Sequence, residues 1–283
     1  MHKIAVVTDS TSDISPQTAS ANDIVIVPLS VIVEGKAYLD GVEITPSQFY
    51  STLASSRDLP KTSQPTPEQF MGVYKPLLEA GHSIVSVHIS GGLSSTVESA
   101  RSAARMLDAA CIRVIDSKSI SYGIAFLALE AAKAIQQGLS LENIVARLEK
   151  LRRETEVLFT LCTLEYLHKG GRIGKVSALL GSLLDIKPVI RVEDGIYVPL
   201  RKVRTIKQAL EAFVHYMQSK VGNSPVYVAV GHGKAYEAAL ALREMVSKAA
   251  NVVGDIPVFE VGPVIGAHTG PGTVGFAFRS AAT

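Results

Sequence analysis

Tryptophan is absent from this chain of 283 residues, and aromatic side chains make up only 6% of it. Proteins that bind single-stranded nucleic acid usually stack bases on aromatic rings, and this chain has little material for such a surface. Its formal net charge is only +2, whereas nucleic-acid-binding domains usually carry clustered basic residues. We therefore expect no nucleic acid among its partners.

Long apolar runs are also missing. The longest candidate, Ile24–Val33, has ten residues and includes Pro28, whereas a membrane-spanning helix needs about 20 apolar residues. The first residues lack the charged segment, apolar core and small-residue cleavage site of a signal peptide. We expect a cytoplasmic protein without stable membrane insertion.

Cysteine is scarce, with two residues, Cys111 and Cys162. Both lie in apolar, strand-like runs without CxxC or Cys/His spacing, which predicts buried structural thiols. Asp9 and Asp13 share one loop, but two carboxylates without further ligand spacing are more typical of a turn than of a metal site. We predict no metal.

Apolar residues are abundant, at 47% against 19% charged, and the mean hydropathy is +0.25. The length suits two domains with a cleft between them. The apolar excess has two interpretations, an alanine-rich core or a cavity for an apolar ligand.

Strand-like and helix-like segments alternate in the first half, which is typical of a parallel sheet covered by helices. From residue 156 the pattern changes, and Asp194-Gly195 between two apolar runs predicts an antiparallel hairpin. We predict a two-domain α/β protein, with a parallel-sheet α/β domain over residues 1–155 and a mixed-sheet α/β domain over residues 156–283. The predicted elements include strands at Ile4–Val7, Ile24–Val33, Ile84–Ile89, Ile112–Ile115 and Val157–Leu164, and a helix near Val176–Leu184.

Three hydroxyl-rich loops lie at predicted strand ends or helix starts: Thr8–Asp13, Thr62–Gln64 and Ser90–Thr96. In a parallel sheet such loops gather at one edge, where ligands bind. Ser94 and Ser95 are predicted to open a helix, whose free N–H groups and dipole favour an anion. The alternative is that these serines only cap the helix.

Residues 262–273 are so rich in glycine and proline that we predict a structured loop, in which His268 has room to meet a ligand. Gly270, Gly272 and Gly275 match a dinucleotide fingerprint in spacing, but a strand-like segment follows them instead of a helix. Arg172 lies in a basic turn and is either a carboxylate contact or a solvated side chain.

A serine hydrolase acting on acyl esters would need Ser94 and His268 to act with an aspartate. The sequence around Ser94 is not G-x-S-x-G, so the strained turn that exposes a hydrolase serine is not indicated. The hydrolase remains an alternative of a different class.

Five segments together resemble the DegV family, and the resemblance spans essentially the whole chain. Each segment is weakly specific alone, but all five occur in the family's order and at suitable separations. In the serine loop, Gly92 adds a second glycine where a single one is more usual. The segments are TDSTSD at Thr8–Asp13, KTSQPTP at Lys61–Pro67, SGGLSSTVESA at Ser90–Ala100, EYLHKGGRIGK at Glu165–Lys175 and GPVIGAHTGPGTVG at Gly262–Gly275.

The resemblance implies a long-chain fatty acid between the two domains, with the acyl chain in an apolar tunnel and the carboxylate near the cleft mouth. It further implies a monomeric, non-catalytic binding subunit without a cofactor, whose partner is a fatty-acid kinase catalytic subunit that phosphorylates the carboxyl group to an acyl phosphate. A lipid-sensing regulatory module is another alternative. The head-group residues implied are Thr62, Ser63, Ser94, Ser95 and His268, with Arg172 and Thr269 as weaker candidates.

Overall fold

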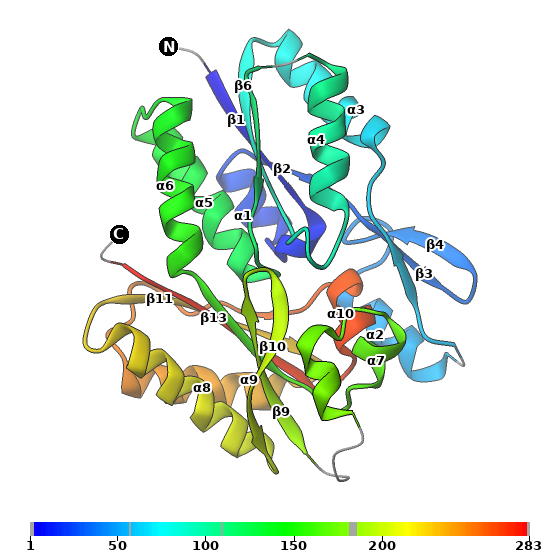
Figure 1. Ribbon diagram of the computed structural model, residues 1–283, viewed down its shortest axis with the longest axis vertical. Coiled ribbons are helices and arrows are strands. Elements are labelled where there is room, and N and C mark those ends of the chain that lie inside the picture. The colour runs from blue at the N-terminus through cyan, green and yellow to red at the C-terminus, as the bar shows by residue number, and fades with distance from the viewer. Residues whose placement is uncertain (1–2, 57, 109, 181–185, 282–283) are drawn as a thin grey trace.

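The computed structural model describes residues 3–56, 58–108, 110–180 and 186–281. Apolar runs in the first half form a four-stranded parallel sheet in the order β2-β1-β6-β7 (Figure 1). The parallel sheet predicted from the alternating pattern is therefore confirmed. Its strands are β1 (Lys3–Asp9), β2 (Ile24–Val27), β6 (His82–His88) and β7 (Ile112–Asp116).

Helices pack on both faces of this sheet. Side chains of α3 and α4 share one apolar cluster with the sheet, whereas those of α5 and α6 share another that extends into the second half of the chain. Thr66 and Gln69 form a capping box at the start of α3, and Ser140 caps α6 through the Asn143 N–H. The helices are α1 (Pro16–Ala21), α3 (Pro67–Glu79), α4 (Thr96–Met106), α5 (Tyr122–Gln136) and α6 (Leu141–Glu154).

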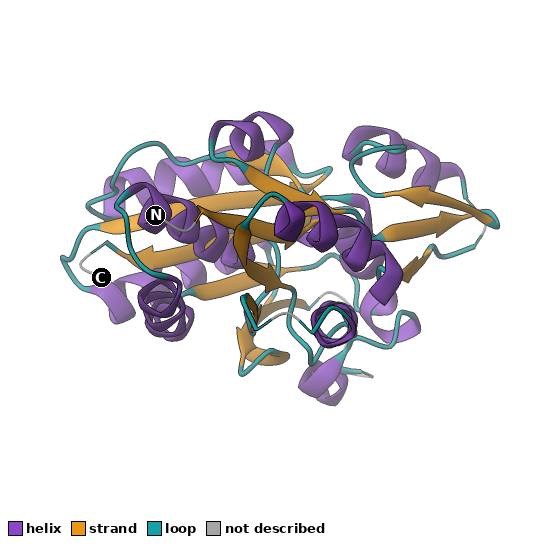
Figure 2. Ribbon diagram, turned by 90° about the horizontal axis from the view of Figure 1, so that it is seen from above, coloured by secondary structure: helices purple, strands orange, loops and turns teal. Residues whose placement is uncertain are grey.

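The prediction of one strand over Ile24–Val33 is wrong. Pro28 has no N–H group for a sheet ladder, and the run divides into β2 and β3, which belong to different sheets. The second is a small antiparallel sheet that projects from one side of the molecule (Figures 1 and 2). It comprises β3 (Ser30–Val33), β4 (Lys36–Leu39) and β5 (Lys61–Ser63), and α2 (Pro46–Ser55) lies between β4 and β5 in the chain.

A six-stranded mixed sheet occupies the second half, in the order β10-β9-β8-β13-β11-β12. Asp194 and Gly195, with φ of 49° and 82°, form the predicted hairpin turn between β9 and β10. One face packs against α8 (Ile206–Val221) and α9 (Tyr236–Ala249). The strands are β8 (Glu156–Thr160), β9 (Lys187–Glu193), β10 (Ile196–Val203), β11 (Val226–Gly233), β12 (Val258–Glu260) and β13 (Thr273–Ser280).

The short elements differ most from the predictions. The strand from Val157 ends at Thr160, before α7 (Glu165–Lys169). Of the helix predicted near Val176–Leu184, the described part is a 3-10 helix, η2 (Gly174–Leu179), and residues 181–185 lie outside the described residues. The loop predicted over residues 262–273 is wrong at its start, because α10 (Pro263–Thr269) is a helix.

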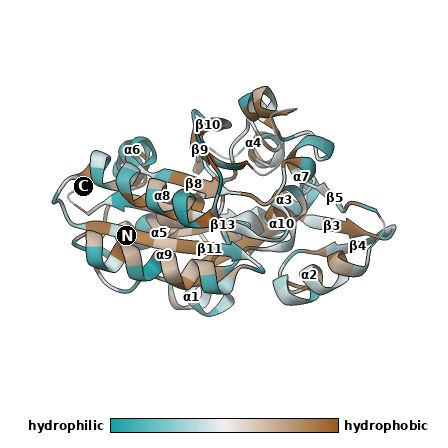
Figure 3. Ribbon diagram, turned by 90° about the horizontal axis from the view of Figure 1, so that it is seen from below, coloured by the Kyte–Doolittle hydropathy of each residue, from teal (hydrophilic) through white to brown (hydrophobic). Residues whose placement is uncertain are grey.

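The two larger sheets share one apolar core. The helix α5 lies between them, so ten of its fifteen residues are buried. Hydrophobic side chains concentrate on the strands, and hydrophilic ones on the outward helix faces (Figure 3). No helix in the described part of the chain is long and apolar enough to cross a membrane.

Candidate functional site

A polar pocket lies where the serine loop, the small sheet, the loop after α7 and α10 meet. It is narrow, with a volume of about 30 Å³. Four predicted site residues from these distant segments come together in it: Thr62, Ser94, Arg172 and His268. The remaining lining residues are Leu29, Gln64, Ile89, Leu93, Tyr197, Val264 and Ile265.

His268 lies on α10, not in the predicted loop. Pro263 occupies the first turn of α10, where a helix makes no use of the N–H group that proline lacks. The proline therefore favours the start of a helix, although we had interpreted it as evidence for a loop. Six of the seven helical residues are buried, and tertiary packing therefore stabilises a helix that would not form in isolation. His268 is the one residue of α10 that reaches the polar pocket while keeping some exposure.

The imidazole of His268 forms a hydrogen bond with the Thr62 hydroxyl. Its Nε2 lies 2.8 Å from Thr62 Oγ1. A Cβ built on Gly170 would lie 2.4 Å from His268 Nδ1, so a glycine C–H points at that nitrogen. A proton on Nδ1 would point into this C–H group, and we therefore assign the proton of the neutral ring to Nε2. Thr62 then accepts from the ring, and its own O–H is free to donate to a ligand.

Burial, together with the smaller effect of the Arg172 charge, lowers the pKa of His268 from 6.5 to about 4. The ring is therefore neutral at neutral pH. A neutral ring with its proton on Nε2 orients Thr62 without adding a positive charge to the pocket.

Ser94 precedes α4 at the carboxyl end of β6. Its Oγ lies 2.8 Å from Thr96 Oγ1 and 3.3 Å from the Thr96 backbone nitrogen, so part of its role is to order the helix start. Ser95 is the N-cap residue, but its side chain forms no capping bond. The Thr96 N–H donates to Ser94 Oγ and the Glu98 N–H donates to the Ser95 carbonyl at 3.1 Å, so the start of α4 favours an anion in the polar pocket through its dipole and the Ser94 hydroxyl.

Arg172 supplies the cation of the polar pocket. Its Nε donates to the Leu93 carbonyl at 3.1 Å, and its Nη1 donates to the Gly170 carbonyl at 2.9 Å. The guanidinium therefore joins the loop after α7 to the serine loop. Because guanidinium has five N–H donors, it can hold both carbonyls and still attract an anion.

The structure does not place three other predicted residues in the polar pocket. Ser63 and Ser95 are exposed and do not line it, and Thr269 is buried with its hydroxyl donated to the Ile265 carbonyl. Thr62 and Ser63 belong to β5, where alternation turns neighbouring side chains to opposite faces, so only one faces inward. The sequence argument missed Gln64 and Tyr197, although Tyr197 follows the predicted hairpin turn directly.

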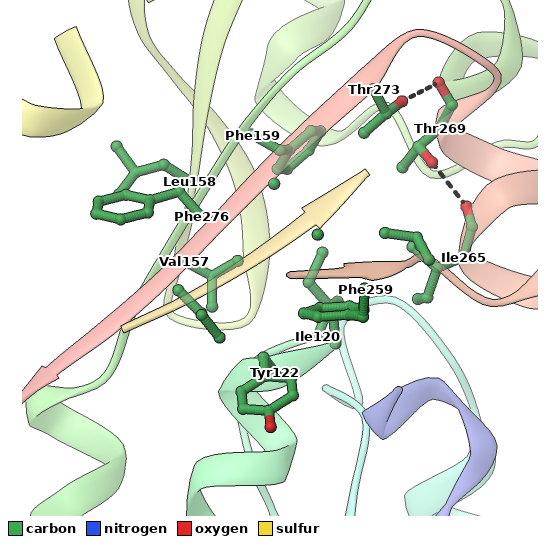
Figure 4. A pocket seen from close by; sticks show the side chains of 16 residues that line it. Ile120, Tyr122, Val157, Leu158, Phe159, Phe259, Ile265, Thr269, Thr273 and Phe276 are labelled. Atoms are coloured by element: carbon green, nitrogen blue, oxygen red, sulfur yellow. Dashed lines mark hydrogen bonds between the residues drawn. The ribbon is translucent and has the colours of Figure 1, made fainter. Parts of the chain in front are cut away.

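An apolar cavity adjoins the polar pocket. It is narrow, with a volume of about 30 Å³, and lies between α5 and the sheet face opposite α8 and α9 (Figure 4). Ile265 lines both spaces, so they meet at α10. The rings of Tyr122 and Phe259 stack with centroids 5.0 Å apart on one side of the cavity. The other lining residues include Ile120, Val157, Phe159, Ala229, Gly231, Val261, Thr269, Thr273, Gly275 and Ala277.

Comparison with known proteins identifies the family. A model of the DegV family, described as uncharacterised proteins, matches residues 3–281. The chain belongs to the DegV family.

Relatives in the DegV family cover nearly the whole chain. A DegV domain-containing protein of Streptomyces coelicolor is 37% identical over 98% of both chains. A DegV family protein from Thermus thermophilus, whose structure is described as showing fatty-acid binding, has a TM-score of 0.94 and 38% identity, covering 98% of this chain and 99% of its own. A stearic-acid-binding protein from Eubacterium ventriosum has a TM-score of 0.89 and 30% identity, covering 98% of both chains. Members of the DegV family with this two-domain α/β fold thus bind fatty acids.

The described part of this DegV chain assembles no hydrolase triad at Ser94. The side chain of Ser94 forms hydrogen bonds with Thr96, and that of His268 forms one with Thr62. An Asp-His-Ser chain does occur elsewhere: Asp9 Oδ2 lies 2.9 Å from His88 Nδ1, and His88 Nε2 lies 2.7 Å from Ser86 Oγ. All three side chains are fully buried, so no substrate reaches them. Asp9 also accepts the Ile89 N–H at 3.1 Å, so this chain supports the serine loop.

The described residues contain no group of three or more His, Cys, Asp or Glu side chains placed to hold a metal ion. Both cysteines are free. Their predicted burial is wrong: Cys162 is exposed and Cys111 is only partly buried. The strand before Cys162 ends at Thr160, so this thiol lies outside the sheet that was predicted to cover it.

Two carboxylates from the first half position α10. Asp13 Oδ1 accepts the Gly262 N–H at 2.9 Å, and Asp40 accepts the Val264 N–H. Burial raises the pKa of each carboxyl from 3.8 to about 7, although hydrogen bonds from Ser121 and Ser10, respectively, oppose the shift. Their mutual repulsion acts in the same direction as burial.

These carboxylates predict a loss of stability as the pH rises. In the unfolded chain both ionise near pH 4, but in the folded protein they keep protons until about pH 7. The folded state thus binds more protons between these values, so the free energy of unfolding should fall as pH rises through this window. In Asp13→Asn the fall should be smaller, because one of the two buried groups no longer ionises.

Urea denaturation at about pH 5 and about pH 8 measures this effect. The exposed Asp255→Asn variant is the control and should keep the wild-type dependence on pH. An Asp13→Asn variant whose stability changes with pH as much as that of the wild type would show that Asp13 does not hold a proton at neutral pH.

Proposed function

We propose that this chain binds a long-chain fatty acid, with the carboxylate in the polar pocket and the acyl chain in the apolar cavity. The observation that carries the proposal is the junction of the two spaces at Ile265. One side of the junction offers hydroxyl groups, a helix N-terminus and a guanidinium, and the other offers almost only hydrocarbon. A fatty acid has this division of chemistry, and the family relatives support the choice.

The apolar cavity supplies most of the favourable free energy. Each buried methylene contributes roughly 0.8 kcal/mol, so about fifteen methylenes contribute on the order of 12 kcal/mol before the costs of binding are subtracted. Residues around the cavity are already buried, so the ligand is sheltered from water along its length.

The polar pocket offsets the cost of desolvating the carboxylate. Thr62 donates its O–H because His268 orients it, Ser94 adds a further hydroxyl, the dipole of α4 favours the anion, and Arg172 adds the charge. An unpaired carboxylate at this depth would be strongly unfavourable, whereas one that accepts several hydrogen bonds is not. Ser63, Ser95 and Thr269 have no direct part in this arrangement.

We further propose that the chain is a non-catalytic, monomeric, cytoplasmic subunit, and that a separate kinase subunit phosphorylates the bound carboxylate. A carboxylate oxygen would attack the γ-phosphorus of ATP, ADP would leave, and an acyl phosphate would remain in the polar pocket. Two N–H groups of Arg172 already donate to the Leu93 and Gly170 carbonyls, so the direct donors to the head group are mainly the hydroxyls of Thr62 and Ser94, which leave an oxygen lone pair available for this attack. The proposed division at residue 155 fits this role, because every strand of the six-stranded sheet follows it and the ligand lies between the two parts.

Reconstitution tests the kinase step. The purified chain is loaded with stearate and mixed with ATP and the kinase catalytic subunit of the source organism, and acyl phosphate is trapped with hydroxylamine. We expect the acyl hydroxamate only when the chain, the kinase subunit and ATP are all present. Equal product without the chain, or product from the chain and ATP alone, would contradict the division of labour.

A further inference from the structure

The floor of the apolar cavity is a trough of small residues. Along β11 and β13, every second residue faces α8 and α9 with a large apolar side chain, such as Val230 or Phe276. Between them, small residues line the cavity: Ala229 and Gly231 on β11, and Thr273, Gly275 and Ala277 on β13. Gly231 pairs with Gly275 across the two strands, and Ala229 pairs with Ala277.

The next pair closes this trough with large side chains. Tyr227 pairs with Arg279, and the Arg279 guanidinium carbon lies 4.4 Å from the centre of the Tyr227 ring. Arg279 Nη2 lies 2.9 Å from a carboxylate oxygen of Glu130, whose other oxygen lies 2.6 Å from Arg147 Nη2. We call Tyr227, Arg279 and Glu130 the end wall.

The end wall resists displacement. Arg279 is 7% exposed and Glu130 is 5% exposed, so moving either side chain would leave a buried charge without its partner. Breaking a buried ion pair in this way is strongly unfavourable. A ligand that reaches the end wall therefore meets a fixed barrier, whereas apolar side chains could repack around it.

Gly275 keeps the middle of the trough open. A Cβ at this position would meet only the Gly231 carbonyl oxygen, at an ordinary contact distance of 3.7 Å. At Gly231 a Cβ would lie 2.9 Å from the Phe259 ring and 3.0 Å from a Val261 methyl group. The space above Gly275 thus belongs to the cavity, whereas the space above Gly231 is already filled by the side chains of β12 and its neighbour.

We propose that the paired residues of β11 and β13 determine the longest acyl chain that this protein accepts. The terminal methyl group would lie over Ala229 and Ala277, and the end wall would exclude longer chains. From Thr273 to Arg279 the strand advances six residues, or about 20 Å at roughly 3.4 Å per residue. This inference rests on the proposed function, and it names the ligand class as straight long-chain acids that span this trough.

Two variants and one control test the proposal. Ala277→Leu places a larger side chain beside the end wall, Gly275→Leu places one nearer the polar pocket, and Ala146→Leu makes the same change at an exposed position of α6. Binding of laurate, palmitate and stearate to each purified protein is measured by competition with a fluorescent fatty acid. Thermal unfolding without ligand checks that each variant is folded, and Ala229→Val replaces Ala277→Leu if the latter does not fold.

We expect Ala277→Leu to weaken stearate binding by about tenfold, the value of roughly two buried methylenes, and to change laurate binding by less than about twofold. Gly275→Leu should weaken all three, because every chain passes over Gly275. Variants that keep the wild-type order of affinities would overturn the end-wall proposal and leave fatty-acid binding intact. If the wild type binds none of the three acids, the proposed function fails, and this inference fails with it.

Discussion

Ser94→Ala and His268→Ala are each expected to weaken stearate binding by about tenfold to a hundredfold without unfolding the protein. Hydrogen bonds to a charged group are worth roughly 1.5–3 kcal/mol, and each 1.4 kcal/mol is about tenfold in affinity. Ser94→Ala removes a donor directly. His268→Ala acts through Thr62. The Thr62 hydroxyl lies 2.8 Å from His268 Nε2, and without the imidazole it loses the hydrogen bond that orients it.

Titration calorimetry with stearate measures these affinities, and circular dichroism with thermal unfolding checks the fold. Ser95→Ala is the matched control for Ser94, since Ser95 is the exposed neighbour and its side chain forms no capping bond. We expect the control to bind like the wild type. If both Ser94→Ala and His268→Ala keep wild-type affinity, the carboxylate does not bind in the polar pocket.

Gly170→Ala should disturb the polar pocket, although Gly170 itself does not line it. The new methyl group would lie 2.4 Å from His268 Nδ1, so the imidazole must move away from Gly170 and take Thr62 with it. The φ of −75° at Gly170 suits alanine, but the methyl group would also lie 2.7 Å from the Tyr166 carbonyl oxygen, so the end of α7 must shift slightly as well. We expect stearate affinity to fall by about tenfold, comparable to the loss of one oriented hydroxyl donor.

Gly72→Ala is the matched control for this substitution. Gly72 lies on an exposed part of α3, and a Cβ there would meet nothing within 4 Å. Alanine should therefore leave binding unchanged and favour the helix by up to about 1 kcal/mol. The account of His268 would be wrong if Gly170→Ala bound stearate as tightly as Gly72→Ala does.

Much of this arrangement was predictable where local chemistry and tertiary packing agree. Apolar runs followed by capped helices indicated the parallel sheet, and Asp194-Gly195 indicated the hairpin because both residues adopt positive φ. Loops that follow parallel strands gather at one edge, which predicted Ser94 and the Thr62–Gln64 loop as parts of one site. His268 and Arg172 were candidates from their own loops, the family resemblance implied the same residues, and the structure places Thr62, Arg172 and His268 in one pocket with Ser94.

Other features depend on tertiary packing, which no local sequence pattern indicates. The helix α10 forms because its residues are buried against the rest of the protein and because Asp13 and Asp40 accept N–H groups from its first turn and the residue before it. Those carboxylates lie more than 220 positions away in the sequence. In the sequence, the small residues of β11 and β13 indicate only a weak preference for strands. Their alignment along the cavity follows from the register of the two strands. Tyr197 was missed because nothing in the hairpin sequence indicates which strand face meets the polar pocket.

Native mass spectrometry of the purified protein tests the central claim most directly, with organic extraction to identify any bound molecule. We expect a one-to-one complex with a long-chain fatty acid, either copurified or formed on addition of stearate. Ser94→Ala should need a higher stearate concentration than Ser95→Ala to form this complex. A wild-type protein that carries no lipid and forms no complex with added stearate would contradict the account.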